Sequence, residues 1–211
     1  MTQKQIIELV QQHHPVAGET EIRLALNRAK DDFCTKSEII ENTFVQTSVP
    51  GKRYYSLDEA ILRIKDVQIH DVSIPRLIGK PVIDDDEYDA ATGLTSGASS
   101  SNERYWYIDN NRLGLVEKIN GVVTRDGKQT DYQSISEAKE IRIHAISKDD
   151  DFTSELTETG NIPAQYRDAL VFKVIAELML RQGSAVFNME LSQLFEAKYQ
   201  TQVKNAKKYA R

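Results

Sequence analysis

The segment Ala169–Leu180 constrains the fold of this chain more than any other stretch. Within it only Lys173 and Glu177 are polar, and these two, followed by Arg181, recur at intervals of four residues. A helix with this pattern carries one narrow polar stripe and is apolar over the rest of its circumference. Such a helix has to be surrounded by other elements, so the fold must supply packing partners on several of its sides.

Helical patterns at both ends of the chain can supply these partners. Thr2 and Gln5 form a candidate capping box at the start of a first helix. A second helix is predicted from about Glu19 to about Thr35, because apolar residues recur there at the +4, +3, +4 spacing of one helix face. Pro163 suits the first turn of the apolar helix, since its missing N–H costs nothing there. The apolar face of a last helix is expected to consist of Phe187, Leu191, Leu194, Tyr199 and Val203.

The middle of the chain has the turn signals and composition of β-structure. Residues 40–49 are rich in β-branched side chains and end at the turn signal Pro50-Gly51. The segment Tyr105–Val116, with Asp109-Asn110-Asn111 at its centre, predicts a β-hairpin, and Asp126-Gly127 predicts a second turn. Residues 93–102 are rich in glycine and serine and predict a loop. Further extended segments are expected at residues 53–57, 62–74 and 141–146.

These patterns together predict an α+β fold. Residues 1–36 and 162–211 are expected to form a helical bundle core, closed by the two ends of the chain. Residues 37–161 are expected to form an antiparallel β-rich unit inserted between them.

The composition excludes several classes of function. A formal charge of −5 and a pI near 5.5 argue against a general nucleic-acid binder. No run approaches the ~20 apolar residues that span a bilayer, and the N-terminus lacks the apolar segment of a secretory signal. Cys34 has no partner for an intrachain disulfide, and its place beside Phe33 near the end of a helix favours a packed, inert thiol.

The sequence offers no support for an enzyme, a cofactor site or a metal site. Gly-x-Ser-x-Gly and the glycine-rich phosphate-binding motifs are all missing. The acidic runs Asp84–Asp89 and Asp149–Asp151 could hold Mg²⁺ or Ca²⁺, as a metal-dependent hydrolase would require, but the first lacks the EF-hand spacing and solvated loops are favoured. The histidines also give no cluster with ligand spacing: His13, His14, His70 and His144.

Two segments stand out as candidate binding surfaces. Tyr105-Trp106-Tyr107 could stack on bases or sugars, although one face of this strand is more readily explained as core. The tail Lys198–Arg211 contains five basic residues against one acid at its edge, Glu196, in a chain that is acidic overall. Favourable charge at a helix C-terminus covers only the last turn, so a charged partner surface is the second interpretation of this tail.

Three stretches resemble the head-to-tail adaptor (connector or collar) proteins of tailed bacteriophages. The first is the helix Glu21–Phe33, with a Leu-Asn-x-Ala-x-x-x-Phe pattern. The second runs from the Val49-Pro50-Gly51 turn through Tyr54–Leu57 to Ile74-Pro75-Arg76-Leu77. The third is Ile162–Val171, followed by a helix pair that ends in Tyr199 and the basic tail. Residues 122–140 are longer and more polar than the corresponding hairpin of that family.

The resemblance implies a structural virion protein without catalytic residues. Such adaptors form a ring, usually twelvefold, beneath the portal protein at the capsid vertex. DNA only passes through the channel of the ring, and no membrane is involved. The helical part packs against neighbouring copies, the β-rich unit faces the tail (nozzle or tail-tube) protein, and the C-terminal segment grips the portal. The location implied is the head–tail junction of the virion, after assembly in the cytoplasm of the host bacterium.

On this sequence the portal-contacting residues are expected within the segment Lys198–Arg211. They are Lys198, Tyr199, Lys204, Lys207, Lys208, Tyr209 and Arg211. The alternative function is a monomeric or trimeric virion binding module that recognises carbohydrate or peptide through its β-rich unit.

Overall fold

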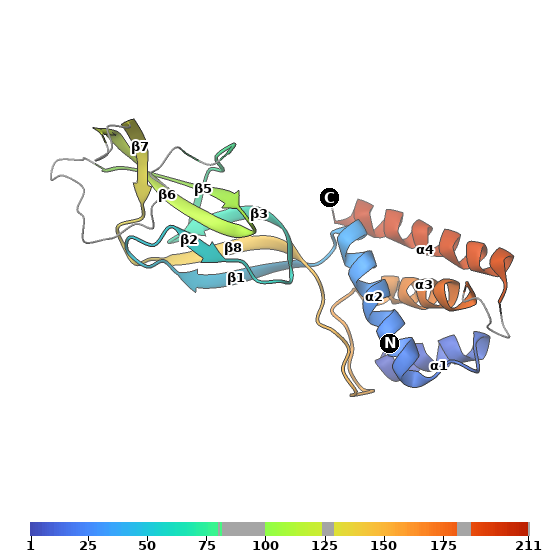
Figure 1. The fold of residues 1–211 in the computed structure, drawn as a ribbon. Coiled ribbons are helices and arrows are strands. Elements are labelled where there is room, and N and C mark those ends of the chain that lie inside the picture. Colours follow the sequence, from blue (N-terminus) through green and yellow to red (C-terminus); the bar gives the residue numbers. More distant parts are fainter. Residues whose placement is uncertain (80, 82–99, 124–128, 181–186, 211) are drawn as a thin grey trace. The chain divides into compact units, whose positions relative to one another are not determined.

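The computed structural model describes residues 1–79, 81, 100–123, 129–180 and 187–210 (Figure 1). The chain divides into two compact units, Met1–Asn42 with Ile146–Arg211, and Thr43–Ala145. The helical elements are α1 (Gln3–His13), α2 (Glu19–Ser37), the 3-10 turn η2 (Ala164–Tyr166), α3 (Arg167–Met179) and α4 (Met189–Tyr209). The strands are β1 (Glu41–Thr47), β2 (Tyr54–Ser56), β3 (Ile61–Ile69), β4 (Val72–Ile74), β5 (Ser100–Asp109), β6 (Arg112–Val123), β7 (Gln129–Ser134) and β8 (Glu140–Ser147). The predicted α+β class is confirmed: helices from both chain ends pack together, and two antiparallel sheets are inserted between them.

Helix α3 is the centre of the helical unit, as its composition predicts. In Figure 1 it lies between α1 and α4 and is crossed by α2. The two polar residues of its stripe each pair with a flanking helix: Lys173 Nζ lies 3.1 Å from Glu196 Oε2, and Glu177 Oε1 lies 3.0 Å from Arg28. The rest of α3 is almost entirely buried: Ala169, Leu170, Val171, Val174, Ile175, Ala176, Leu178 and Met179.

The ends of these helices follow the local sequence. The capping box of α1 is present, because the Thr2 hydroxyl accepts from the Gln5 N–H and the Gln5 side chain accepts from the Thr2 N–H. Pro163, predicted in the first turn of α3, instead precedes η2, which leads directly into α3. None of the described helices is both long enough and apolar enough to cross a bilayer.

Residues 148–161 pack against α2, although the sequence analysis placed them in the inserted unit. Asn27 accepts the Phe152 N–H and donates to the Phe152 carbonyl oxygen, at 2.9 and 3.2 Å. Lys30 is fully buried, and its ammonium donates to the Asp150 carbonyl and lies 3.0 Å from the Asp151 carboxylate. This segment therefore belongs with the helices by its contacts, while the division at residues 36 and 162 into separate domains stays a prediction.

The inserted unit consists of two sheets that share one hydrophobic core. The first sheet has the strand order β1-β8-β3-β4, and the second has β2-β6-β5 with β7 paired to β6. Alternate residues of both sheets point into the core, as expected for sheets packed face to face. The core comprises Tyr55, Val67, Ile69, Ile74, Trp106, Leu113, Leu115, Ile135, Ile141, Ile143 and Ala145.

The predicted hairpin is confirmed in strands β5 and β6. Tyr105 lies opposite Val116 and Ile108 opposite Leu113, with Asn110 and Asn111 at positive φ in the turn. Two such residues are typical of a type I′ turn, whose twist suits a hairpin. Tyr107 lies over Gly114, where a Cβ would overlap its ring.

The sequence analysis missed strand β7, which pairs with β6. Its sequence, Gln-Thr-Asp-Tyr-Gln-Ser, has little of the apolar alternation that marks a strand. The predicted turn at Asp126-Gly127 and residues 93–99 of the predicted loop lie outside the described residues. The last part of that loop, residues 100–102, belongs to β5.

Candidate functional site

Helix α4 carries most of the sequence-predicted site residues. It begins at Asn188, whose side chain accepts the Leu191 N–H at 2.9 Å and so caps the helix. The Ser192 hydroxyl donates to the Ala176 carbonyl at 2.8 Å, which brings the start of α4 close to α3. The buried side recurs at helical spacing and consists of Ser192, Phe195, Tyr199, Val203 and Ala206.

The apolar face predicted for this helix is partly wrong. Tyr199 and Val203 are buried, but Phe187 and Leu194 are 51% and 52% exposed. Two small residues, Ser192 and Ala206, are part of the buried side, and a search for large apolar side chains does not detect them. As a result the true buried stripe is rotated away from Leu194 and toward Phe195.

The first two predicted contact residues, Lys198 and Tyr199, differ in exposure: Lys198 is at the surface of α4 and Tyr199 is buried. Lys198 is exposed, and its ammonium lies over the rings of Phe195 and Phe172, 5.1 and 5.6 Å from their centroids. Tyr199 is 0% exposed, and its hydroxyl donates to Asp32 of α2 at 2.8 Å. Tyr199 is therefore part of the packing that fixes α4, and only Lys198 of the two presents a charge at the surface.

The Tyr199–Asp32 contact is electrostatically tuned. Burial alone would raise the pKa of Asp32, but the hydrogen bonds from Lys36 and Tyr199 and the charges of Lys36 and Lys173 outweigh burial and hold this pKa below its usual value. Burial, and then the hydrogen bond to the Asp32 carboxylate, raises the pKa of Tyr199 well above its usual range. Both shifts favour one state, an ionised Asp32 that accepts from a neutral Tyr199.

The C-terminal turns of α4 present the other predicted residues. Lys204 and Lys208 are exposed and one helical turn apart, and Lys207 is half-buried. Tyr209 is 69% exposed, although its ring centroid lies 6.3 Å from that of Tyr166. Lys204, Lys207 and Lys208 form no ion pair with any other described residue. We call Lys198, Lys204, Lys207, Lys208 and Tyr209 the basic face of α4; Arg211 lies outside the described residues.

The solvated loop expected for the acidic run Asp149–Asp151 is wrong for Asp149 only, because Asp150 and Asp151 are exposed. Asp149 is buried and accepts the backbone N–H and the side-chain amide of Asn161, both at 2.8 Å. A Cβ at Gly160 would approach Asp149 Oδ2 to 2.7 Å, so this contact needs a glycine there. The run Asp84–Asp89 lies outside the described residues, and those that are described contain no group of three or more candidate metal ligands.

Cys34 is buried, as its position beside Phe33 predicts. Burial raises the pKa of its thiol to about 11, so almost none of it is thiolate at neutral pH. A nucleophilic role for this cysteine is thereby disfavoured.

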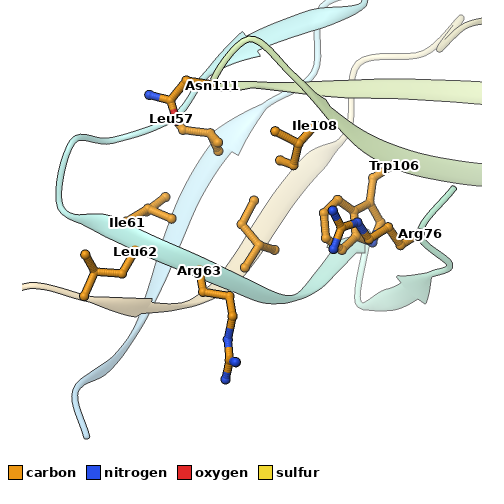
Figure 2. Close-up of a pocket in the computed structure, with 9 residues that line it drawn as sticks. Leu57, Ile61, Leu62, Arg63, Arg76, Trp106, Ile108 and Asn111 are labelled. Carbon is orange, nitrogen blue, oxygen red and sulfur yellow. The ribbon is translucent and has the colours of Figure 1, made fainter. Parts of the chain in front are cut away.

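A cavity of about 200 Å³ lies in the β-rich unit, at the aromatic hairpin that the sequence singled out (Figure 2). Trp106 and Ile108 of β5 line it, whereas Tyr105 and Tyr107 do not. Its other lining residues are Leu57, Ile61, Leu62, Arg63, Ile64, Arg76 and Asn111. The sequence pointed to this hairpin but gave no sign of the apolar wall from β3.

The surfaces described above, a basic helix face and a small cavity, are candidate binding surfaces. In a comparison with known families, the family of SU10 adaptor proteins matches residues 1–211. The chain therefore belongs to the SU10 adaptor protein family, a family of phage head-to-tail adaptors and not of enzymes. No curated protein matches the sequence.

Proposed function

We propose that this chain is a structural virion protein that forms a ring, of twelve copies by the family resemblance, and joins the capsid vertex to the tail. The observation that carries the proposal is family membership over the full length of the chain. Two observations on the described residues are compatible with the proposal: the lone cysteine is buried, and no group of three or more candidate metal ligands is found among them.

The basic face of α4 is the part of the chain proposed to contact the portal protein. Its lysines are not neutralised by the described part of this chain, so they are available to acidic groups of a partner. Lys198, Lys204, Lys207, Lys208, Tyr209 and Arg211 would make this contact. Tyr199 would contribute from inside the protein, by holding α4 against α2.

The other surfaces have proposed partners as well. The helical unit packs against neighbouring copies in the ring, and the β-rich unit meets the tail protein, a nozzle or tail-tube component. DNA passes through the channel without being held, and no membrane takes part. The location is the head–tail junction, reached by assembly in the host cytoplasm.

Electron microscopy of virions tests the adaptor function directly. We expect this chain in a ring between portal and tail. Its position elsewhere in the particle, or its absence, would overturn the proposal. Monomers or trimers at the particle surface would support the alternative, a module that binds carbohydrate or peptide, for which the cavity at Trp106 is the candidate site.

Charge reversal on α4 tests the portal contact. Removing residues 202–211 would also remove the buried Val203 and Ala206, so substitutions are the cleaner change. We expect Lys204→Glu with Lys208→Glu to leave the thermal unfolding of the isolated protein nearly unchanged, because both side chains are exposed. Attachment to purified portals, measured by co-sedimentation at low salt, should fall by at least about tenfold, as expected when several interfacial charges are reversed.

The matched control is Lys4→Glu with Lys52→Glu, which changes the net charge equally at exposed positions away from α4. This control should attach to portals normally. Equal attachment by both double variants would contradict the assignment of the basic face to the portal.

A further inference from the structure

The cavity in the β-rich unit runs along the edge of a strand. Four consecutive residues of β3, Ile61–Ile64, line it. Because successive side chains of a strand point to opposite faces, four in a row can line one cavity only where it follows the strand edge. Strand β4 covers β3 only at residues 67–69, so among the described residues no strand pairs with the β4 side of β3 along the cavity.

The opposite wall of the cavity contains a second open edge, at Ile108 of β5. The N–H and C=O of Trp106 point away from β6 and bond Pro75 and Leu77, at 3.1 and 2.8 Å. Backbone groups two residues apart on a strand point the same way, so those of Ile108 also face away from β6. No backbone group in the described part of the chain bonds them. An extended segment could therefore pair with β5 at this point.

The side chains that line the cavity indicate what kind of group it can hold. Leu57, Ile61, Ile64 and Ile108 offer apolar surface. An apolar cavity of about 150 Å³ can hold a molecule as large as benzene, so about 200 Å³ leaves room for one large side chain. At the end of the cavity beside Trp106, the guanidinium of Arg76 lies 5.2 Å from the indole centroid (Figure 2). An arginine beside an indole ring can still donate from its guanidinium N–H groups to a carboxylate.

We propose that an extended segment of another virion protein adds to the sheet beside Ile108. It places one large apolar side chain in the cavity and a neighbouring carboxylate against Arg76. Strand addition of this kind combines backbone hydrogen bonds with a side-chain pocket. The identification of the partner as a virion protein rests on the proposed function. The apolar and acidic side chains of the bound segment are inferred from the cavity itself.

The test uses the full-length chain and overlapping peptides that cover the structural proteins of the same virion. The strongest binder is then labelled with fluorescein, and its Kd is measured by anisotropy. We expect bound peptides to share a large apolar residue within two positions of Asp or Glu. Arg76→Glu should raise Kd at least about tenfold, and a peptide carrying Lys in place of its acid should bind this variant better than the wild type.

Two pairs of variants complete the test. The first separates side-chain from backbone recognition at Ile108, and the second controls for the charge change at Arg76. Ile108→Pro should weaken binding more than Ile108→Ala, because only proline removes the N–H that β6 does not use. Lys52→Glu is the matched control for Arg76→Glu, since Lys52 also lies 5.2 Å from an aromatic centroid, that of Tyr55, and does not line the cavity. Lys52→Glu should bind the peptide normally.

Four outcomes would overturn the inference: no bound peptide, equal binding by Arg76→Glu and wild type, oligosaccharide binding in place of peptide, or equal binding by the two Ile108 variants. Replacement of Asp84–Asp89 by glycine and serine adds a fifth, because tighter peptide binding would make this acidic run of the chain the natural occupant. A ring seen in virions together with any of these results would leave the adaptor function standing and reject the peptide site alone.

Discussion

Tyr199 and Asp32 show how single residues decide the use of α4. The hydroxyl of Tyr199 reaches Asp32 Oδ2 at 2.8 Å, and Lys36 donates to the same oxygen at 2.7 Å. The ammonium groups of Lys36 and Lys173 also lie over the Tyr199 ring, 5.6 and 5.2 Å from its centroid. The basic residues near α4 therefore fall into two sets. Lys36 and Lys173 contact the buried Tyr199 and help to fix the helix, and the basic face is left for a partner.

Tyr199→Phe tests the hydrogen bond that holds α4 against α2. The change keeps the ring and removes one hydrogen bond to a partly exposed carboxylate, so we expect a loss of about 1 kcal/mol in the free energy of unfolding. Urea unfolding at neutral pH measures it. Tyr209→Phe is the control, because Tyr209 is largely exposed, and it should unfold like the wild type.

The pKa of Asp32 gives this effect a pH dependence. A carboxyl whose pKa is lowered on folding stabilises the protein above its unfolded pKa, and the contribution is lost as the pH falls through the folded pKa. The difference between Tyr199→Phe and wild type should therefore shrink in acid. A difference that is constant from neutral pH to below the folded pKa of Asp32 would show that the bond does not depend on the charge of this group.

At the scale of elements, Lys30 connects α2 to residues 148–161. Its side chain is 0% exposed. Its ammonium donates to the Asp150 carbonyl and the Asp151 carboxylate, and it lies 5.5 Å from the centroid of the Phe152 ring. Lys30→Met keeps much of the buried volume and leaves the carbonyl without its donor. We expect a loss of about 1–3 kcal/mol in the free energy of unfolding.

Lys148→Met is the matched control, because Lys148 Nζ pairs with Asp31 at 3.2 Å near the surface, where such pairs contribute about 1 kcal/mol or less. Thermal or urea unfolding of both variants measures the difference. A Lys30→Met protein as stable as Lys148→Met would contradict the structural role of Lys30.

The elements that the sequence predicted correctly are those in which large apolar residues mark the period. Helix α3 and the β5–β6 hairpin are of this kind, since their patterns and turn residues agree with the packing they make. The buried stripe of α4 was misplaced because Leu194 was assigned to it in place of its neighbour Phe195, and because the stripe also contains Ser192 and Ala206, which are not large apolar residues. Strand β7 was missed because its stability comes from pairing with β6 and not from its own composition.

The candidate sites were predictable to different degrees, for a related reason. The basic face of α4 follows from sequence position alone, because Lys204 and Lys208 are four residues apart on one helix. The cavity at Trp106 joins residues from β3, β5 and the segment after β4, which are far apart along the chain. Which strand edges remain open depends on the pairing of both sheets, and periodicity in the sequence carries no information about that pairing.

At the scale of the whole molecule, the two points where the chain passes between the units lie close together, so the inserted unit can be removed from the chain. The chain leaves the helical unit at Asn42 and returns at Ile146, and the two connecting strands are neighbours in one sheet. The Ser147 N–H donates to the Ile40 carbonyl at 3.0 Å, and the Asn42 side chain donates to the Ser147 hydroxyl at 2.7 Å. A short linker can therefore span the two ends without strain.

We predict that a chain in which residues 43–145 are replaced by a short glycine–serine linker folds as a cooperative helical protein. Its core is complete without the insertion, because α1, α2 and α4 cover α3. Circular dichroism should show a helical spectrum and one cooperative thermal transition. If the basic face of α4 is the portal contact, this protein also co-sediments with portals but does not recruit tails. A non-cooperative transition would show that the sheets are needed to fold the helices, and recruitment of tails would place the tail contact in the helical unit.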